Sequence, residues 1–175
     1  MTRSLCIALL AASLGLAGPA IAQEAGQAMQ IGSGFRQDPN LPVEITSDAL
    51  TVDQTAATAT FSGSVLAVQG QLRLTADQAL VEYARDTNAM SRLTATGSVV
   101  LTTPTEAAEA TRAVYDLAAG TLVMDGNVLL TQGFGAISGE RLTVNLTAGT
   151  ARMEGRVRTV FKPGDSGQAP GAANP

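Results

Sequence analysis

Hydrophobic and polar positions alternate at period two in four segments that recur along this chain. The segments are Ile45–Asp53, Leu74–Glu82, Ala108–Asp116 and Ile137–Asn145. In each segment, mostly apolar residues stand two and four places after a marker position. The markers are Asp48, Asp77, Thr111 and Glu140. Alternation at this period places apolar side chains on one face of a β-strand, so the pattern predicts an all-β fold of half-buried strands.

A Gly-x-Val triplet follows each of these segments. The triplets begin at Gly63, Gly97, Gly126 and Gly155. The glycine comes 15 residues after the marker in three repeats and 20 residues after it in the second, so a single insertion lies within residues 83–92. Repeats of this kind bury their apolar faces only by stacking on one another. We therefore expect the chain to bend at each glycine and to re-enter the core at the following valine.

The segment Pro104–Arg112 is the one part of the repeats with a helical composition. Its glutamates, Glu106 and Glu109, stand three residues apart, as they would on one face of a helix. The register of this segment nevertheless matches that of the strands in the other repeats. We predict a strand here, preceded by an irregular loop.

The first 22 residues have the features of a cleaved export signal. Arg3 is their only charge, Leu5–Leu16 is apolar, and Ala20-Ile21-Ala22 fits the cleavage rule. No later stretch approaches the roughly 20 apolar residues of a spanning helix. Both ends of the mature chain are rich in Gly, Pro, Gln and Ala. We predict four regions: signal peptide 1–22, flexible leader 23–41, one ordered domain 42–161 and disordered tail 162–175.

Composition removes several classes of function. The chain has no histidine, and its one cysteine, Cys6, lies in the predicted signal. This excludes Ser-His-Asp and Cys-His nucleophile systems, the usual zinc sites and any disulfide in the mature chain. Without Arg3, ten basic residues face fifteen acidic ones. The net charge of −5 argues against a general nucleic-acid-binding protein.

Several linked motifs resemble one known family. They are Pro42–Asp48 (PVEITSD), Thr60–Val65 (TFSGSV), Gln69–Asp77 (QGQLRLTAD) and Gly126–Gln132 (GNVLLTQ). Over roughly residues 41–161 the sequence resembles the LptA/OstA-like family of periplasmic lipopolysaccharide-transport proteins. The resemblance implies a twisted, open β-jelly roll built from repeated antiparallel strand units. It also implies a periplasmic protein that is not an enzyme and needs no cofactor.

The resemblance implies a role in building the outer membrane of Gram-negative bacteria. Such domains stack end to end as a bridge that carries lipopolysaccharide from the inner to the outer membrane. The implied partners are the OstA-like domains of an inner-membrane adaptor and of the outer-membrane translocon, and a head-to-tail homo-oligomer is possible. The lipid A acyl chains of lipopolysaccharide would lie in the apolar interior.

An acyl-chain site needs an uncharged lining, because each buried CH₂ of the lipid contributes about 0.8 kcal/mol. Our candidates are Val43, Ile45, Leu50, Val52, Phe61, Val81, Tyr115, Leu117, Leu122, Met124 and Val128. The same residues would form an ordinary closed core. The alternative function is therefore an exported structural or adaptor β-repeat protein with no lipid ligand. Uptake of an amphiphile would separate the two.

Charge differs between the two ends of the predicted domain. Glu44, Asp48 and Asp53 lie at its start, and Arg152, Arg156 and Arg158 lie near its end. Opposite charges at the two ends would steer head-to-tail docking. They would equally protect open strand edges from association, and the arginines would also suit lipid phosphates. Sequence alone leaves these interpretations open.

Overall fold

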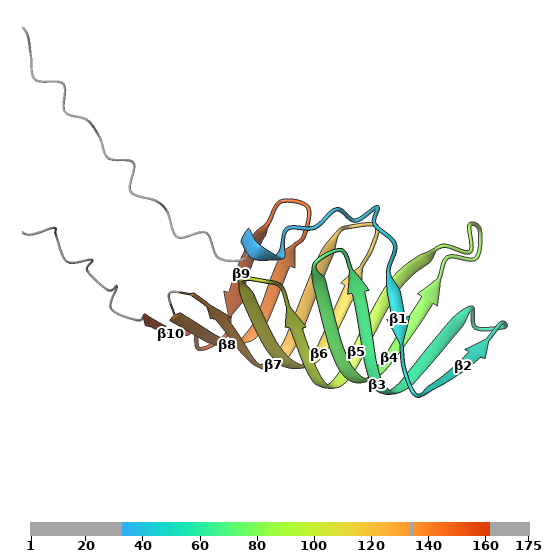
Figure 1. Cartoon of the computed structure of the whole chain (residues 1–175), viewed down its shortest axis with the longest axis horizontal. Helices are drawn as coiled ribbons and strands as arrows, with labels where there is room; N and C mark the ends of the chain where they lie inside the picture. Colours follow the sequence, from blue (N-terminus) through green and yellow to red (C-terminus); the bar gives the residue numbers. More distant parts are fainter. Residues whose placement is uncertain (1–32, 134, 162–175) are drawn as a thin grey trace, which may run out of the picture.

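The computed structural model describes residues 33–133 and 135–161, which form one antiparallel sheet of ten strands. The predicted signal peptide and tail lie outside the described residues. The elements are the 3-10 turn η1 (Ser33–Phe35) and the strands β1 (Glu44–Thr46), β2 (Ala49–Asp53), β3 (Thr58–Gln69), β4 (Leu72–Tyr83), β5 (Met90–Thr102), β6 (Glu106–Asp116), β7 (Thr121–Gln132), β8 (Gly135–Asn145), β9 (Thr150–Glu154) and β10 (Arg158–Phe161). The predicted all-β jelly roll is confirmed, and the strands follow one another along a curved trough (Figure 1).

Each long strand bends in the middle, and the bends divide the sheet into two wings. The register shifts at the bend in every pairing from β3·β4 to β7·β8. The first wing contains β2, residues 58–62, 78–83, 90–96, 112–116, 121–125 and 141–145, and β9. The second wing contains β1, residues 65–69, 72–76, 99–102, 106–110, 128–132 and 135–139, and β10.

The marker and the glycine of each repeat meet at the bend. A Cβ atom added to Gly63, Gly97, Gly126 or Gly155 would lie less than 3.0 Å from the side chain of Asp48, Asp77, Thr111 or Glu140, respectively. All four glycines have φ between +76° and +99°. Residues with a Cβ rarely adopt this conformation. The marker and the glycine of each repeat are therefore in contact in space, whether 15 or 20 residues separate them in sequence.

The apolar faces predicted from the repeats point into the trough and form the core. The largest fully buried side chains include Leu101, Leu122, Met124, Leu130 and Leu142. Three valines of the Gly-x-Val triplets, at positions 65, 99 and 128, are each 1% exposed, as expected. Val157 is 50% exposed, so its predicted burial is wrong. It follows the last bend of the described sheet, where no further repeat covers it.

The segment of helical composition in the third repeat, Pro104–Arg112, forms a loop followed by a strand. β6 begins at Glu106, and the irregular stretch before it includes Pro104. Thr103 Oγ1 accepts a hydrogen bond of 3.1 Å from the Glu106 N–H, which stabilises the turn into the strand. The interpretation of this segment as a strand after a loop is confirmed.

The described part of the predicted leader packs against the sheet. We call residues Ser33–Leu41 the strap. In Figure 1 the strap runs along the open side of the trough, at the level of the hairpins that end the strands, from η1 to β1. Its Phe35 side chain is completely buried in the core. The strap therefore covers part of the opening between the two wings.

Candidate functional site

An open cavity lined mostly by hydrophobic side chains lies at the end of the trough where the sheet begins. We call it the mouth; its volume is about 370 Å³. Its lining comes from the end of the strap and the residues that follow it, β1, β3, the end of β4, the start of β5 and the turn after β6. The lining residues are Leu41, Val43, Ile45, Phe61, Tyr83, Met90 and Leu117. The mouth can accept an apolar group, because its lining carries no charged side chain.

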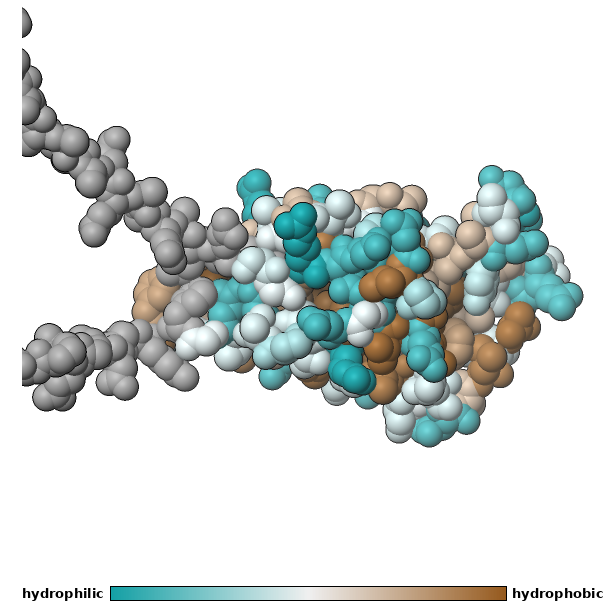
Figure 2. Space-filling model, turned by 45° about the horizontal axis from the view of Figure 1, so that its top comes forward, coloured by the Kyte–Doolittle hydropathy of each residue, from teal (hydrophilic) through white to brown (hydrophobic). Residues whose placement is uncertain are grey.

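Four of the candidate lipid-binding residues line the mouth, and two continue its surface outward. Val43, Ile45, Phe61 and Leu117 are the four in the lining. On β2, Leu50 pairs with Phe61 and Val52 pairs with Ala59, so both point to the inner face. They are 56% and 60% exposed. Figure 2 shows hydrophobic surface exposed toward the right-hand end of the molecule, where Figure 1 places β1 and β2.

The other five candidates lie in a closed core. Val81, Tyr115, Leu122, Met124 and Val128 are each at most 5% exposed. The cavity beside Tyr115 and Leu122 has a volume of only about 20 Å³. This is about the space of one water molecule. The structure thus places all eleven candidates on the inner face, but it separates an open mouth from a closed core.

Sequence analysis missed three residues of the mouth. Tyr83 and Met90 lie in the segment 83–92 that contains the insertion of the second repeat, and Leu41 lies at the predicted leader boundary. Tyr83 and Met90 pair with each other across β4 and β5. The sequence signal that could have identified them is the presence of apolar residues at both ends of this segment. A solvent-exposed loop is usually polar throughout.

Few polar groups enter the interior. The buried ones are Gln69, Glu106 and Gln132, together with the Tyr115 hydroxyl, which donates a 3.1 Å hydrogen bond to Gln69 Oε1. Burial raises the pKa of Tyr115 above its usual value, against the opposing effect of this hydrogen bond. The phenol therefore stays neutral at physiological pH. Within residues 33–133 and 135–161, no cluster of three or more His, Cys, Asp or Glu side chains is placed to hold a metal ion.

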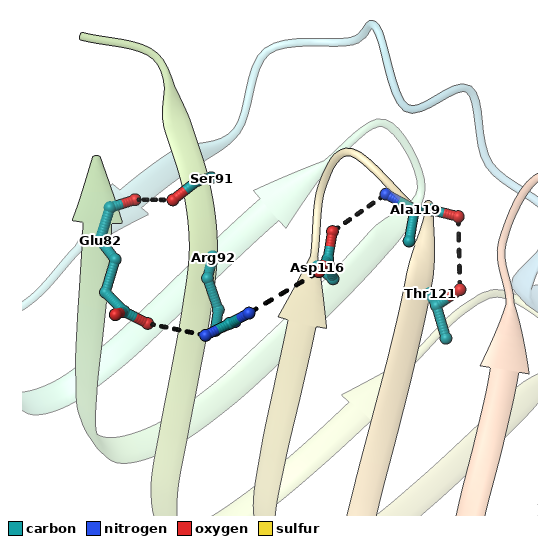
Figure 3. Close-up of polar contacts among 6 residues, drawn as sticks. All are labelled: Glu82, Ser91, Arg92, Asp116, Ala119 and Thr121. Carbon is teal, nitrogen blue, oxygen red and sulfur yellow. Dashed lines mark hydrogen bonds and ion pairs between the residues drawn. The ribbon is translucent and has the colours of Figure 1, made fainter. Parts of the chain in front are cut away.

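Most charged side chains of the long strands lie on the outer face of the sheet, whereas Glu106 is buried. Arg92 on β5 lies 3.7 Å from Glu82 on β4 and 3.9 Å from Asp116 on β6, so one guanidinium joins three strands (Figure 3). An open hollow lies on the same face as these ion pairs and is lined in part by Leu80 and Val114. The sheet separates this hollow from the interior. Exposed ion pairs contribute only about 0–1 kcal/mol each. Their consistent position makes the sheet charged outside and apolar inside.

The charge difference between the two ends is smaller than the sequence indicates. Arg152 lies 3.2 Å from Glu154, and Arg156 lies 2.6 Å from Glu140. These two arginines are therefore partly neutralised by acids of their own chain. Arg158 on β10 makes no ion pair within the described part of the chain.

Comparison with known proteins gives a consistent result. A family model described as LptA/(LptD N-terminal domain) LPS transport protein matches residues 44–150. The chain is similar in structure to LptH, the LptA-homologous periplasmic component of the lipopolysaccharide transport device of Pseudomonas aeruginosa, with a TM-score of 0.65 and 15% identity. The similarity covers 73% of this chain and 99% of LptH. No curated protein matches the chain.

The family match confirms the resemblance inferred from the motifs. It covers β1 to β8 and well over half of the sequence. The structural similarity independently supports the fold. Within the described residues, no helix is both long enough and apolar enough to span a bilayer. The chain belongs to the LptA/LptD N-terminal domain family of LPS transport proteins.

Proposed function

We propose that this protein is a periplasmic carrier that binds the acyl chains of lipopolysaccharide at the mouth and passes the lipid toward the outer membrane. One observation carries the proposal: the apolar inner face continues from the core through the mouth to exposed Leu50 and Val52. A soluble protein gains nothing by exposing such a face unless something covers it. Family membership and the similarity to periplasmic LptH support the same function.

The ends of the sheet suit assembly with like domains. β1 and β2 end the sheet on one side, and β9 and β10 end it on the other. Open strand edges pair readily with the edges of another chain. Head-to-tail pairing would join the inner faces of successive domains into a longer apolar path. The partners in this proposal are further copies and the OstA-like domains of the inner-membrane adaptor and the outer-membrane translocon.

Binding of lipopolysaccharide itself tests the proposal. The protein is mixed with purified lipopolysaccharide and, separately, with a neutral polysaccharide lacking acyl chains, and both mixtures are measured by native mass spectrometry. We expect an adduct with lipopolysaccharide alone. Folded protein without any adduct would instead support the structural β-repeat alternative, which the small interior cavity of about 20 Å³ favours.

Phe61→Arg is expected to weaken lipopolysaccharide binding at least tenfold while the protein stays folded. Phe61 lines the mouth and is only partly buried, so the guanidinium can reach solvent. Acyl chains entering the mouth would meet a charge in place of an aromatic ring, and a loss of about 1.4 kcal/mol already gives a tenfold change. Leu129→Arg, on the outer face of β7, is the matched control. Equal loss of binding in both variants would refute a role for the mouth.

Arg158→Glu is expected to weaken self-association by up to about fivefold, corresponding to about 1 kcal/mol from an exposed charge. The physical reason is that Arg158 is unpaired within the described chain and would face the acidic start of the next copy. Sedimentation velocity at low and high salt measures the effect. Arg73→Glu, an exposed position within β4, is the control. Identical association of the two variants would rule out steering by this end.

A further inference from the structure

The strap joins the rims of the two wings. The Gln37 backbone N–H donates a 2.8 Å hydrogen bond to the Leu146 carbonyl, just after β8 in the first wing. The Gln37 side-chain amide donates a 2.7 Å bond to the Gln69 carbonyl, at the end of β3 in the second wing. One residue of the strap therefore reaches both sides of the opening.

Gln69 fastens the other half of the strap. Its side-chain amide donates to the carbonyls of Leu41 at 2.9 Å and Pro39 at 3.3 Å. The Oε1 atom of the same side chain accepts the hydrogen bond from the hydroxyl of Tyr115, which belongs to the opposite wing. The buried Tyr115–Gln69 pair thus links the strap directly to the core.

Phe35 fills the space between the wings from the strap side. It is fully buried and belongs to the core cluster, although it comes from a three-residue 3-10 turn rather than from the sheet. A phenyl ring and a segment of acyl chain are both apolar groups that gain free energy when they leave water. The place that Phe35 occupies is therefore chemically suited to an acyl chain.

The strap is held less firmly than the strands beneath it. Few hydrogen bonds attach it, whereas neighbouring long strands are joined along their full length. The η1 turn also covers Glu106: a Cβ on Gly34 would lie 2.8 Å from its carboxyl carbon. Glu106 Oε2 and Gln132 Oε1 are buried there and find no hydrogen-bond partner among the described residues. Covering unsatisfied polar atoms disfavours the closed position.

From these contacts we propose that the strap is an internal stopper: Phe35 occupies an acyl-chain subsite, and lipid enters the interior when the strap lifts. This inference rests on the proposed lipid-binding function. It accounts for a closed core behind an open mouth, because Phe35 in its described position fills space that an acyl chain would occupy. Local opening of a weakly held segment is sufficient, and the sheet need not unfold.

Locking the strap with a disulfide tests the inference. A Cβ on Gly149 would lie 3.0 Å from the Arg36 Cβ, close to the 3.5–4.5 Å span of a disulfide. The variant is Arg36→Cys with Gly149→Cys in a Cys6→Ser chain, so the introduced pair are its only cysteines. We expect the oxidised form to bind fluorescently labelled lipopolysaccharide about tenfold more weakly or worse, because the open state is lost. Reduction should restore binding, and each single-cysteine variant is a control.

The outcomes separate this inference from the proposed function. Equal binding by the oxidised and reduced forms would overturn the strap inference and leave lipid binding intact. Failure of the two thiols to crosslink would also overturn it, since the strap would not lie where the structure places it. Absence of binding by the unaltered chain would overturn the proposed function, and the strap inference with it.

A second variant does not depend on the disulfide or on the strained φ of +67° at Gly149. Phe35→Ala is expected to speed lipopolysaccharide binding several-fold, because the subsite is emptied and the strap loses its anchor. Leu129→Ala removes an exposed aliphatic side chain of the outer face and should leave the rate unchanged. Slower binding by Phe35→Ala in folded protein would contradict the role of Phe35 as a stopper.

Discussion

Leu122→Arg is expected to prevent stable folding. Leu122 is 1% exposed and pairs with Tyr115 on one side and Val144 on the other, in the middle of the first wing. The substitution removes about 2–5 kcal/mol of packing and also buries an unpaired charge. The combined loss is comparable with the 5–15 kcal/mol that stabilises a typical domain. Far-UV circular dichroism and urea unfolding of the purified variant measure it.

Leu129→Arg is the control for this experiment. Leu129 lies on the same strand but on its outer face, 38% exposed, and we expect a change within about 0.5 kcal/mol. The contrast also distinguishes a closed core from an open groove. If Leu122→Arg folds normally and loses only lipid binding, its side chain faces an open groove, and the closed core described above is not the state in solution.

Gly126→Ala is expected to destabilise the protein by about 3 kcal/mol. The φ of Gly126 is +86°, and a non-glycine residue in a left-handed conformation loses about 1–2 kcal/mol. The new Cβ would also collide with Thr111 Oγ1, which donates a 3.1 Å hydrogen bond to the Asp125 carbonyl. Either the bend must open or this hydrogen bond must break. Equilibrium urea unfolding gives the free-energy difference.

Two comparisons divide this effect into its parts. In a Thr111→Ala background the collision is gone, and the cost of Gly126→Ala should fall to about the 1–2 kcal/mol of the backbone term. Gly133→Ala should change stability little, because its φ is not positive and nothing lies within 4 Å of the added Cβ. Equal effects at Gly126 and Gly133 would mean that the bend does not require glycine.

The repeats predicted the sheet well because they record local geometry. Two-residue alternation assigns Leu122 and Met124 to the inner face whether or not the far ends of the chain are known. The glycine also follows its marker by 15 residues in three of the four repeats, and the two positions meet at each bend. The error at Val157 has a tertiary cause, since burial depends on a neighbouring repeat and the described sheet has none beyond this bend.

The strap and the closed interior were beyond sequence reasoning for different reasons. Phe35 stands in a stretch rich in Gly, Pro and Gln, with no periodicity that relates it to a core. Its burial depends on Gln37 and Gln69 meeting across the opening, which no local pattern encodes. The sequence also does not distinguish an open groove from a closed core, because the same alternation of apolar residues produces both.

The bends also determine how this architecture can vary. Because each repeat has its own glycine–marker contact at the bend, we expect the width of the trough to be decided repeat by repeat, whereas its length follows from the number of repeats. The width and the length of the trough are therefore independent of each other. Two different chains with the same bend can therefore have troughs of equal width where they meet, even when they contain different numbers of repeats. A continuous conduit assembled from unlike proteins needs that compatibility at every junction.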